Sequence, residues 1–257
     1  PTSALAISSL FTATVTTGAI DLESNALAAN VSWSFTTGST ASVSPVDLGA
    51  ASGFEVLAQA TVTNTGATIV NGDLGLTPGT SVTGFPPGTV DGTIQINTAP
   101  AIAALASLMT AYGDAAGRTS PTIVAENLAG QVLTPGLYTS TATSFEITGG
   151  HLTLDAQGDA NAVWIFQMPA STLTLTAPTC KVILTNGAQF SNVFWQVGSS
   201  ATVGAGCVLE GNILADTSIT LVSGATVHGR SLGGAVTSSG AVTLDTNRVS
   251  AAGGCNQ

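Results

Sequence analysis

Few side chains in this sequence have the types and spacing that a catalytic site requires. Asp155 and Asp159 are close enough in the chain to form the carboxylate pair with which many enzymes cleave polysaccharides. No lysine or arginine lies near them in the sequence to act as a base beside an acid. Aspartate is also a common turn-forming residue, and we expect both to stabilise turns. The sequence therefore predicts no enzyme activity.

Glu210, His228 and Arg230 form a second candidate set, because they fall on equivalent strands of the neighbouring repeats described below. They could meet as an acid, a base and a cation. Charged residues are also the ordinary occupants of exposed strand positions, and a solvated polar patch is the interpretation that we favour. A polysaccharide lyase or hydrolase is the alternative that this set leaves open.

The three cysteines, Cys180, Cys207 and Cys255, do not have the spacing of a metal site. His151 and His228 lie too far from them in the sequence to complete a Cys/His cluster. We expect Cys180 and Cys207 to be small, buried apolar side chains. A disulfide that uses Cys255 is the alternative in a secreted protein, and it would leave one thiol unpaired. No metal or cofactor is predicted.

The composition excludes several classes of partner. Charged residues make up only 7% of the 257 residues, and the net charge is −10. Nucleic acids and anionic membranes require clustered lysine and arginine, but the only permanent cations are Arg118, Lys181, Arg230 and Arg248. No stretch approaches the ~20 apolar residues of a membrane span. A surface of Thr, Ser, Ala, Gly and Asn favours contact with a neutral, ordered surface.

From residue 144 onward the chain repeats one short pattern. Apolar side chains at the second and fourth positions alternate with small or polar ones, as in a strand with one buried side. The five segments are SFEIT (144–148), TLTLT (172–176), SATVG (200–204), SITLV (218–222) and AVTLD (241–245).

Two further families of strand-like segments follow the first. The second family is HLTLD (151–155), CKVIL (180–184), CVLEG (207–211) and TVHGR (226–230). The third is AVWIFQM (162–168), NVFWQVG (192–198), NILAD (212–216) and RSLGGA (230–235). Three strands per repeat with variable turns indicate a parallel β-helix of about six coils. It should be right-handed, as nearly all parallel crossovers are.

The third strand of the repeat needs a cover, because 162–168 and 192–198 are apolar on both faces. An α-helix over about 99–112 can supply it, with Thr98 as N-cap, Pro100 in the first turn and Gly113 at its end. We therefore place this helix along the third face. The apolar stripe predicted to pack there consists of Ile102, Leu105, Ala106, Met109 and Tyr112.

The amino-terminal part is organised less clearly. Residues 1–44 are rich in Ser, Thr and Ala, and are predicted to be an N-terminal extension or cap. Residues 45–257 are predicted to form a single β-helix domain. Within it, ATVTNTGATIVNGDLGL (60–76) has the pattern of one more coil. Residues of about 77–97 contain GFPPG and no strong periodicity, so a cap or loop insertion is expected there.

The outward positions of the first strand carry the strongest functional signal. Their middle column repeats as Thr174, Thr202, Thr220 and Thr243. Residues i and i+2 of a strand are ~6.7 Å apart and neighbouring coils ~4.8 Å apart, so these side chains form a two-dimensional grid. The predicted set is Thr61, Thr63, Thr65, Ser144, Thr148, Thr172, Thr174, Thr176, Ser200, Thr202, Ser218, Thr220 and Thr243.

A threonine grid suits the binding of ordered water. β-branching restricts χ1, so the side chains are held in place before any ligand arrives. Each hydroxyl can anchor a water molecule, and each methyl group orders the water around it. Charges are few on this face, with Glu146 and Asp245 near its ends. Threonine is also favoured in exposed strands of any β protein, so a generic structural solenoid is the alternative.

Several stretches carry a resemblance to a known family. They are FEVLA (54–58), TNTGATIVNGDLGLTPG (63–79), TGFPPGTV (83–90), LTPGLY (133–138), GDANAVWIFQ (158–167), TNGAQFSNVFWQVGSSATVG (185–204), GNILA (211–215) and GATVHGR (224–230). In their order and spacing, the chain resembles the microbial ice-binding proteins, which are built on a discontinuous right-handed β-helix with an alongside α-helix. The resemblance covers about residues 46–247.

The resemblance implies a triangular β-helix in which the coil of residues 60–76 stacks beside the last coil. It implies that the flat face away from the helix, here the Thr/Ser set given above, adsorbs to ice, which produces thermal hysteresis and inhibits recrystallisation. It also implies secretion and no cofactor, and the start at Pro1 without methionine is consistent with a processed chain. We expect a monomer. A structural or adhesive extracellular solenoid and a polysaccharide-active enzyme are the alternatives.

Overall fold

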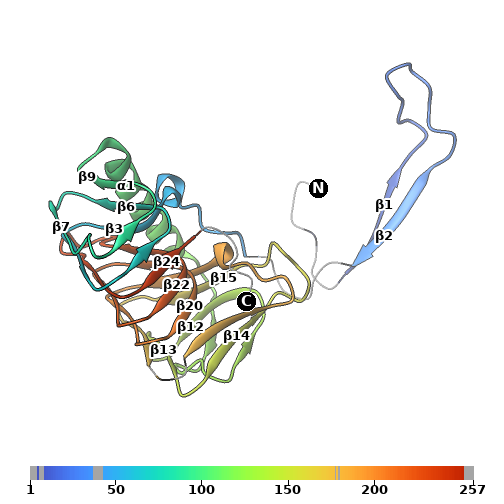
Figure 1. Ribbon diagram of the computed structural model, residues 1–257. Helices are drawn as coiled ribbons and strands as arrows, with labels where there is room; N and C mark the ends of the chain where they lie inside the picture. Colours follow the sequence, from blue (N-terminus) through green and yellow to red (C-terminus); the bar gives the residue numbers. More distant parts are fainter. Residues whose placement is uncertain (1–4, 6–8, 37–42, 177, 179, 252–257) are drawn as a thin grey trace. The chain divides into compact units, whose positions relative to one another are not determined.

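The computed structural model describes residue 5 and residues 9–36, 43–176, 178 and 180–251 (Figure 1). The chain divides into two compact units, Pro1–Ser42 and Val43–Gln257, which are described separately. The division falls close to the predicted boundary after residue 44. Cys255, the predicted alternative disulfide partner, lies outside the described residues.

The first unit contains an antiparallel hairpin of β1 (Leu10–Val15) and β2 (Val31–Thr36). One side of this hairpin is lined by hydroxyl pairs between the two strands. The Oγ atoms of Thr12 and Ser34 are 2.8 Å apart, and those of Thr14 and Ser32 are 2.7 Å apart. The role of this segment as an extension or cap stays a prediction.

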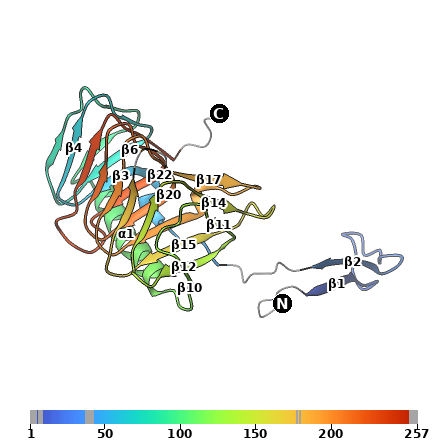
Figure 2. The ribbon, with the colours of Figure 1, turned by 90° about the horizontal axis from the view of Figure 1, so that it is seen from below.

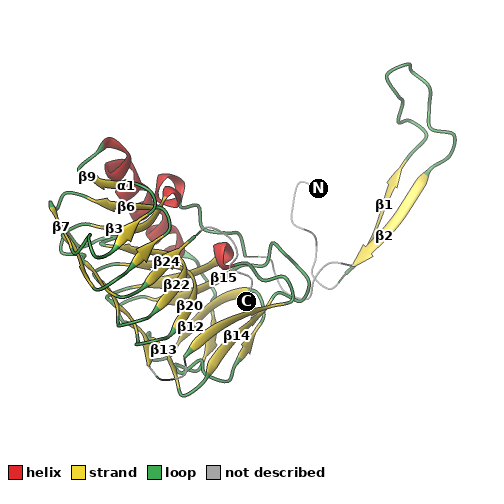
Figure 3. Cartoon of the chain, in the orientation of Figure 1, coloured by secondary structure: helices red, strands yellow, loops and turns green. Residues whose placement is uncertain are grey.

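The second unit is a right-handed parallel β-helix with three faces, and Figure 3 shows how strands dominate it. Face 1 consists, in spatial order, of β13 (Phe145–Thr148), β16 (Leu173–Thr176), β19 (Ala201–Val203), β21 (Ile219–Leu221), β23 (Val242–Asp245), β4 (Thr61–Thr65) and β7 (Ser81–Thr83). Face 2 consists of β11 (Val132–Leu133), β14 (His151–Asp155), β17 (Lys181–Thr185), the first halves of β20 (Val208–Ala215) and β22 (Thr226–Gly233), β24 (Arg248–Ser250), β5 (Ile69–Val70) and β8 (Thr89–Val90). Face 3 consists of β10 (Thr122–Val124), β12 (Gly136–Ser140), β15 (Trp164–Met168), β18 (Val193–Val197), the second halves of β20 and β22, β3 (Phe54–Ala58), β6 (Asp73–Leu76) and β9 (Ile94–Ile96).

Strands β20 and β22 run through the corner between faces 2 and 3 without a break. Gly211 and Gly229 pair with one another at this corner and have φ angles of 117° and 141°. A Cβ atom on Gly229 would lie 2.0 Å from the carbonyl oxygen of Gly211. Only glycine allows both this backbone conformation and this close approach, so the glycines let consecutive coils turn the corner in the same way.

One coil is assembled from both ends of the second unit. Strands β23 and β24, which come late in the sequence, supply faces 1 and 2 of this coil, and β3, which comes early, lies on face 3 between β22 and β6. Strand β4 then pairs with β23, and β5 with β24. The prediction that the coil of residues 60–76 stacks beside the last coil is confirmed.

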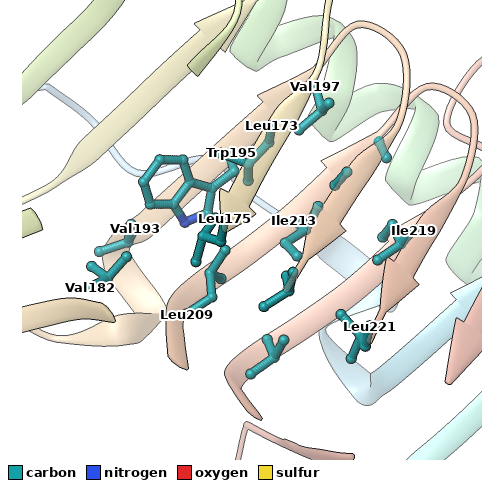
Figure 4. Packing of buried hydrophobic residues seen from close by; sticks show 14 of the residues in the cluster. Leu173, Leu175, Val182, Val193, Trp195, Val197, Leu209, Ile213, Ile219 and Leu221 are labelled. Atoms are coloured by element: carbon teal, nitrogen blue, oxygen red, sulfur yellow. The ribbon is translucent and has the colours of Figure 1, made fainter. Parts of the chain in front are cut away.

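The interior of the β-helix is filled by the inward side chains of all three faces (Figure 4). Leu173 and Leu175 of face 1 lie beside Trp195 of face 3, which is fully buried. The Trp195 ring stacks on Phe166 of the neighbouring coil, with ring centroids 4.1 Å apart and planes inclined by 9°. Its Nε1 donates a hydrogen bond of 3.0 Å to the carbonyl of Glu210.

Helix α1 (Ala99–Gly117) covers the outer side of face 3, as predicted (Figure 2). Its buried face differs from the prediction. Ile102 and Met109 are 54% and 50% exposed, whereas Tyr112 of the predicted stripe is buried. The residues that pack inward are mostly alanines: Ala101, Ala104, Leu108, Ala111, Tyr112 and Ala115. The strands present large side chains here, so small residues allow the helix to approach closely.

The helix also extends beyond its predicted end. Gly113 is exposed within the helix, and a Cβ atom there would meet no neighbour. The chain leaves the helix at Arg118, where the backbone becomes extended. The Nε2 of Gln167 donates hydrogen bonds to the carbonyls of Ala115 and Arg118, at 2.7 and 2.9 Å. Satisfying these terminal carbonyls is what a helix end requires, and a strand side chain supplies it here.

Residues 77–97 are a coil of the β-helix, so the predicted cap or loop insertion is wrong. Strands β7, β8 and β9 pair in parallel with β4, β5 and β6 respectively. The strands are only two or three residues long and are separated by turns with glycine and proline. Segments this short show little periodicity, which explains the error.

Cys180 and Cys207 form a disulfide, which corrects the expectation of two separate buried thiols. Both residues are 1% exposed, so that part of the expectation holds. They lie 27 residues apart in the sequence, just before β17 and β20 on neighbouring coils. The disulfide therefore joins two coils at the corner between faces 1 and 2.

Two short helices complete the second unit. The 3-10 helix η1 (Gly49–Gly53) precedes β3 and packs against α1. The Ser107 hydroxyl of α1 accepts a hydrogen bond of 3.1 Å from the backbone amide of Ala50. The 3-10 helix η2 (Phe190–Asn192) leads into β18.

Candidate functional site

The middle column of face 1 is an in-register ladder of threonines. The strand pairings place each member directly beside the next, from β16 near one end of the stack to β7 at the other (Figure 1). The members are Thr174, Thr202, Thr220, Thr243, Thr63 and Thr83. From Thr174 to Thr243, buried apolar residues on both sides of each threonine, such as Val242 and Leu244 around Thr243, hold the strand with this side chain outward. We name these six residues the threonine ladder.

The hydroxyl groups of the threonine ladder are free to bind an external partner. Among the described residues, none of the six donates or accepts a side-chain hydrogen bond within the protein. Thr63, Thr83 and Thr243 are exposed, and Thr174, Thr202 and Thr220 are half-buried between their neighbours. Each strand places its threonine ~4.8 Å from the next, so the ladder presents hydroxyl and methyl groups at a regular interval.

The column at the start of each strand is also rich in hydroxyls, but several of them stabilise the protein itself. Ser200 and Ser218 accept hydrogen bonds through Oγ from the backbone amides of Ser218 and Ala241, at 3.4 and 3.2 Å. The Ser144 hydroxyl donates to the carboxylate of Glu126. Backbone pairing gives the column as Ser144, Thr172, Ser200, Ser218, Ala241, Thr61 and Ser81. Fewer hydroxyls of this column are therefore available to an external partner than in the ladder.

The column at the end of each strand is interrupted. Thr148, Thr176 and Thr65 belong to it, but Gly204, Val222 and Asp245 stand between them. The Oγ1 of Thr148 is buried and has no partner, so it is not presented to solvent. The Oγ1 of Thr65 donates a long hydrogen bond of 3.5 Å to the carbonyl of Leu244. Of the predicted grid, the middle column is thus the continuous part.

The two carboxylates of face 1 lie at its margins. Glu146 stands beside Thr174, at the end of the ladder opposite to Thr83. Asp245 is not at an end of the stack, because β4 and β7 lie beyond it; it lies at the strand-end edge of the face. Its Oδ1 accepts a hydrogen bond of 3.0 Å from the Thr246 hydroxyl. The ladder between these margins is uncharged.

Sequence reasoning missed two residues of face 1, Ser81 and Thr83. Both are exposed and pair with Thr61 and Thr63. The signal was present, because Ser81, Val82 and Thr83 repeat the alternation of the other first strands. This alternation was overlooked because it is only three residues long and the residues around it are mostly glycine and proline of turns.

The predicted carboxylate pair has a structural role. Asp155 accepts hydrogen bonds from the Gln157 amide and the Asn186 side chain, both at 2.8 Å. The hydrogen bond from Asn186 lowers the pKa of Asp155 below its ordinary value. Asp159 accepts from the Asn161 amide at 2.9 Å. Both carboxylates stabilise turns, as predicted.

The second candidate set does not assemble as a triad. The Nδ1 of His228 lies 2.6 Å from the Oε1 of Glu210, and this hydrogen bond raises the pKa of His228. Arg230 instead donates to the Ser52 carbonyl at 2.7 and 3.0 Å and to the Oδ1 of Asn212 at 3.0 Å. The guanidinium thus links the backbone of Ser52 to the side chain of Asn212.

Within the described ranges, no group of His, Cys, Asp and Glu side chains could hold a metal ion. None of the described helices is long and apolar enough to cross a membrane.

Comparisons with known proteins agree on one family. The family model described as ice-binding-like matches residues 56–250. An ice-binding protein of Nostoc sp. (strain HG1) is 47% identical over 204 residues, which cover 79% of this chain and 73% of that protein. The crystal structure of an ice-binding protein from the Antarctic ascomycete Antarctomyces psychrotrophicus has a TM-score of 0.74 at 43% identity, covering 82% of this chain and all of that one. An ice-binding protein from an Antarctic biological consortium has a TM-score of 0.76 at 47% identity, with 82% and 92% covered.

Proposed function

Because this chain belongs to the ice-binding-like family, we propose that it adsorbs to ice through face 1, with the threonine ladder at the centre of the contact. The observation that carries this proposal is the ladder itself: six threonines in register whose hydroxyls make no bond within the described protein. Adsorption would arrest ice growth around the bound molecules, which gives thermal hysteresis and slows recrystallisation.

The physical basis is a surface that is ordered before ice arrives. The ladder residues are β-branched and sit on paired strands, so binding freezes little additional side-chain motion. Their hydroxyls can take the place of water molecules at a lattice surface, while their methyl groups lie between ordered waters. The uncharged ladder avoids the strong, irregular hydration of ions. Face 3 is unsuited to this role because helix α1 covers it.

The remaining parts of the proposal follow from the same chemistry. We propose that the protein has no catalytic activity, since Asp155 and Asp159 are engaged in turns and Glu210 in a hydrogen bond with His228. Secretion is supported by the disulfide between Cys180 and Cys207, because disulfides persist in oxidising compartments. Ice is the proposed partner, and we expect a monomer that acts without a cofactor.

Ice-affinity partitioning tests this function. A slowly growing ice hemisphere should incorporate the protein, and a crystal held in its solution should become faceted and should not grow when it is cooled slightly below its ordinary freezing temperature. A purely structural or adhesive solenoid would be excluded from the ice and leave round crystals. That result would refute the proposed function.

A further inference from the structure

The threonine ladder is assembled from two parts of the chain that are far apart in sequence. Strands β16 to β23 supply Thr174 to Thr243, and the earlier strands β4 and β7 supply Thr63 and Thr83. The two parts meet where β23 pairs with β4, from Val242 beside Val62 to Asp245 beside Thr65. We name this junction the seam.

No short connection fixes the register of the seam. Within a run of consecutive coils, the length of each turn limits how the next strand can pair, but β4 and β23 are not joined by any such turn. A slip of one residue would turn Thr63 to the interior, and a slip of two residues would move it by ~6.7 Å along its strand and so out of the ladder. Other interactions must therefore specify the alignment.

Gln59 provides such interactions immediately before β4. It is only 7% exposed, and its Nε2 donates to the carbonyl of Gly234, which follows β22. Its backbone amide and that of Ala60 both donate to the carbonyl of Gly240, at 2.9 and 2.8 Å. Gly240 lies just before β23, so this end of β4 is held against the start of its seam partner.

Thr68 provides the matching interaction after β4. It is fully buried, and its Oγ1 accepts a hydrogen bond of 3.0 Å from the backbone amide of Asn247, just beyond β23. Asn247 is 3% exposed, and its Nδ2 donates to the carbonyls of Val222 and Ala225 at 2.8 and 3.2 Å. This chain of bonds reaches from the amino-terminal coil, across the seam, to the coil before β23.

We propose that Gln59 and Thr68 are positioning residues of the ice-binding face. They clamp the two ends of β4 against the β23 coil and so set the register in which Thr63 and Thr83 continue the ladder. Neither side chain touches ice in this account. The inference rests on the proposed function, since it concerns the length of the surface that binds ice.

A double-mutant cycle separates positioning from general stability. Gln59→Leu and Thr68→Val would each be made in the wild type and in a Thr63→Ala/Thr83→Ala background, with thermal hysteresis measured per folded molecule. In the wild type, each seam variant should lower hysteresis toward that of Thr63→Ala/Thr83→Ala. In the background that already lacks these hydroxyls, the same changes should have little further effect, because the residues they position are gone.

Two further variants act as controls. Thr68→Ser retains the acceptor oxygen and should keep the wild-type hysteresis. Thr185→Val removes a comparable bond, of 3.3 Å to the Leu154 carbonyl, between coils away from the seam, and should also keep it. Amide hydrogen exchange should accelerate around residues 54–97 in Thr68→Val, while the coils of β14 to β18 retain their protection. If Thr68→Val does not fold, Gln59→Leu carries the cycle alone.

The outcomes are distinguishable. An equal fractional loss in both backgrounds, or no loss in either, overturns the positioning role and leaves ice binding intact. Thr202→Tyr, measured in parallel, tests the face itself. If Thr202→Tyr keeps full hysteresis, ice does not bind through face 1, and the proposed assignment of the ice-binding face fails together with this inference; loss of ice binding in the unmodified protein would instead refute the proposed function.

Discussion

Replacement of Trp195 by alanine should cause a large loss of stability. The side chain is fully buried, stacks on Phe166 at 4.1 Å and donates a 3.0 Å hydrogen bond to the Glu210 carbonyl. Truncating a buried aromatic residue costs about 3–5 kcal/mol, of which the aromatic pair contributes about 1 kcal/mol. For a unit of this size, the loss corresponds to a fall in Tm of about 10 °C.

Urea unfolding followed by far-UV circular dichroism would measure this loss. Trp195→Phe keeps a ring against Phe166 but loses the indole N–H, so it should cost about 1–2 kcal/mol. Trp33→Ala is the control, since Trp33 is 52% exposed and lies in the hairpin unit. The unfolding of the β-helix should not respond to it. A loss below about 1 kcal/mol for Trp195→Ala would show that the Trp195 ring is not packed in the interior of the β-helix as described.

Three further predictions concern stability. Replacing Cys180 and Cys207 by alanine opens a link across 27 residues, which should cost about 3.5 kcal/mol in urea unfolding; an unchanged midpoint would refute this. The pKa of His228 is raised by Glu210, so the stabilisation is complete below the unfolded-state pKa and is lost as the pH rises through the folded-state value. The Tm should therefore fall as the pH passes from about 6 to 8, and Glu210→Gln should remove this dependence. Met109→Lys should change stability by less than about 0.5 kcal/mol, because Met109 is half exposed; a larger loss would show that the predicted stripe is buried.

The fold could be predicted wherever one physical signal dominated. The strict alternation in residues 144–148, 172–176 and 218–222 identified face 1, because only one side of these strands is buried. The doubly apolar strands identified the face that needs a cover. The register of the ladder followed from the same alternation, and its members from Thr174 to Thr243 are adjacent as expected.

The errors arose where a local pattern did not contain the deciding contact. The stripe of Ile102 and Met109 has the larger apolar side chains, but the fit to bulky strands favours the alanine face of α1. The coil of residues 77–97 has strands too short to display a period. The partners Cys180 and Cys207 are distant in sequence and become neighbours only through the spacing of the coils.

The candidate site was predicted as a set of positions, and the structure distinguishes among them. Sequence alternation places Thr148 and Thr202 outward alike, yet the hydroxyl of Thr148 is buried. Ser144 is bonded to Glu126, which no pattern around residue 144 indicates. Such differences depend on the neighbouring coil, which is supplied by another part of the chain.

The most direct test of ice binding through face 1 is the thermal hysteresis of Thr202→Tyr beside Thr153→Tyr. Thr202 is central in the threonine ladder, and Thr153 occupies the middle of β14 on face 2 with a similar, half-buried exposure. A tyrosine at residue 202 would hold ice away from several neighbouring threonines, so hysteresis should be largely lost while circular dichroism is unchanged. Thr153→Tyr should retain it. Full hysteresis in Thr202→Tyr together with its loss in Thr153→Tyr would contradict the account, because ice would then bind face 2.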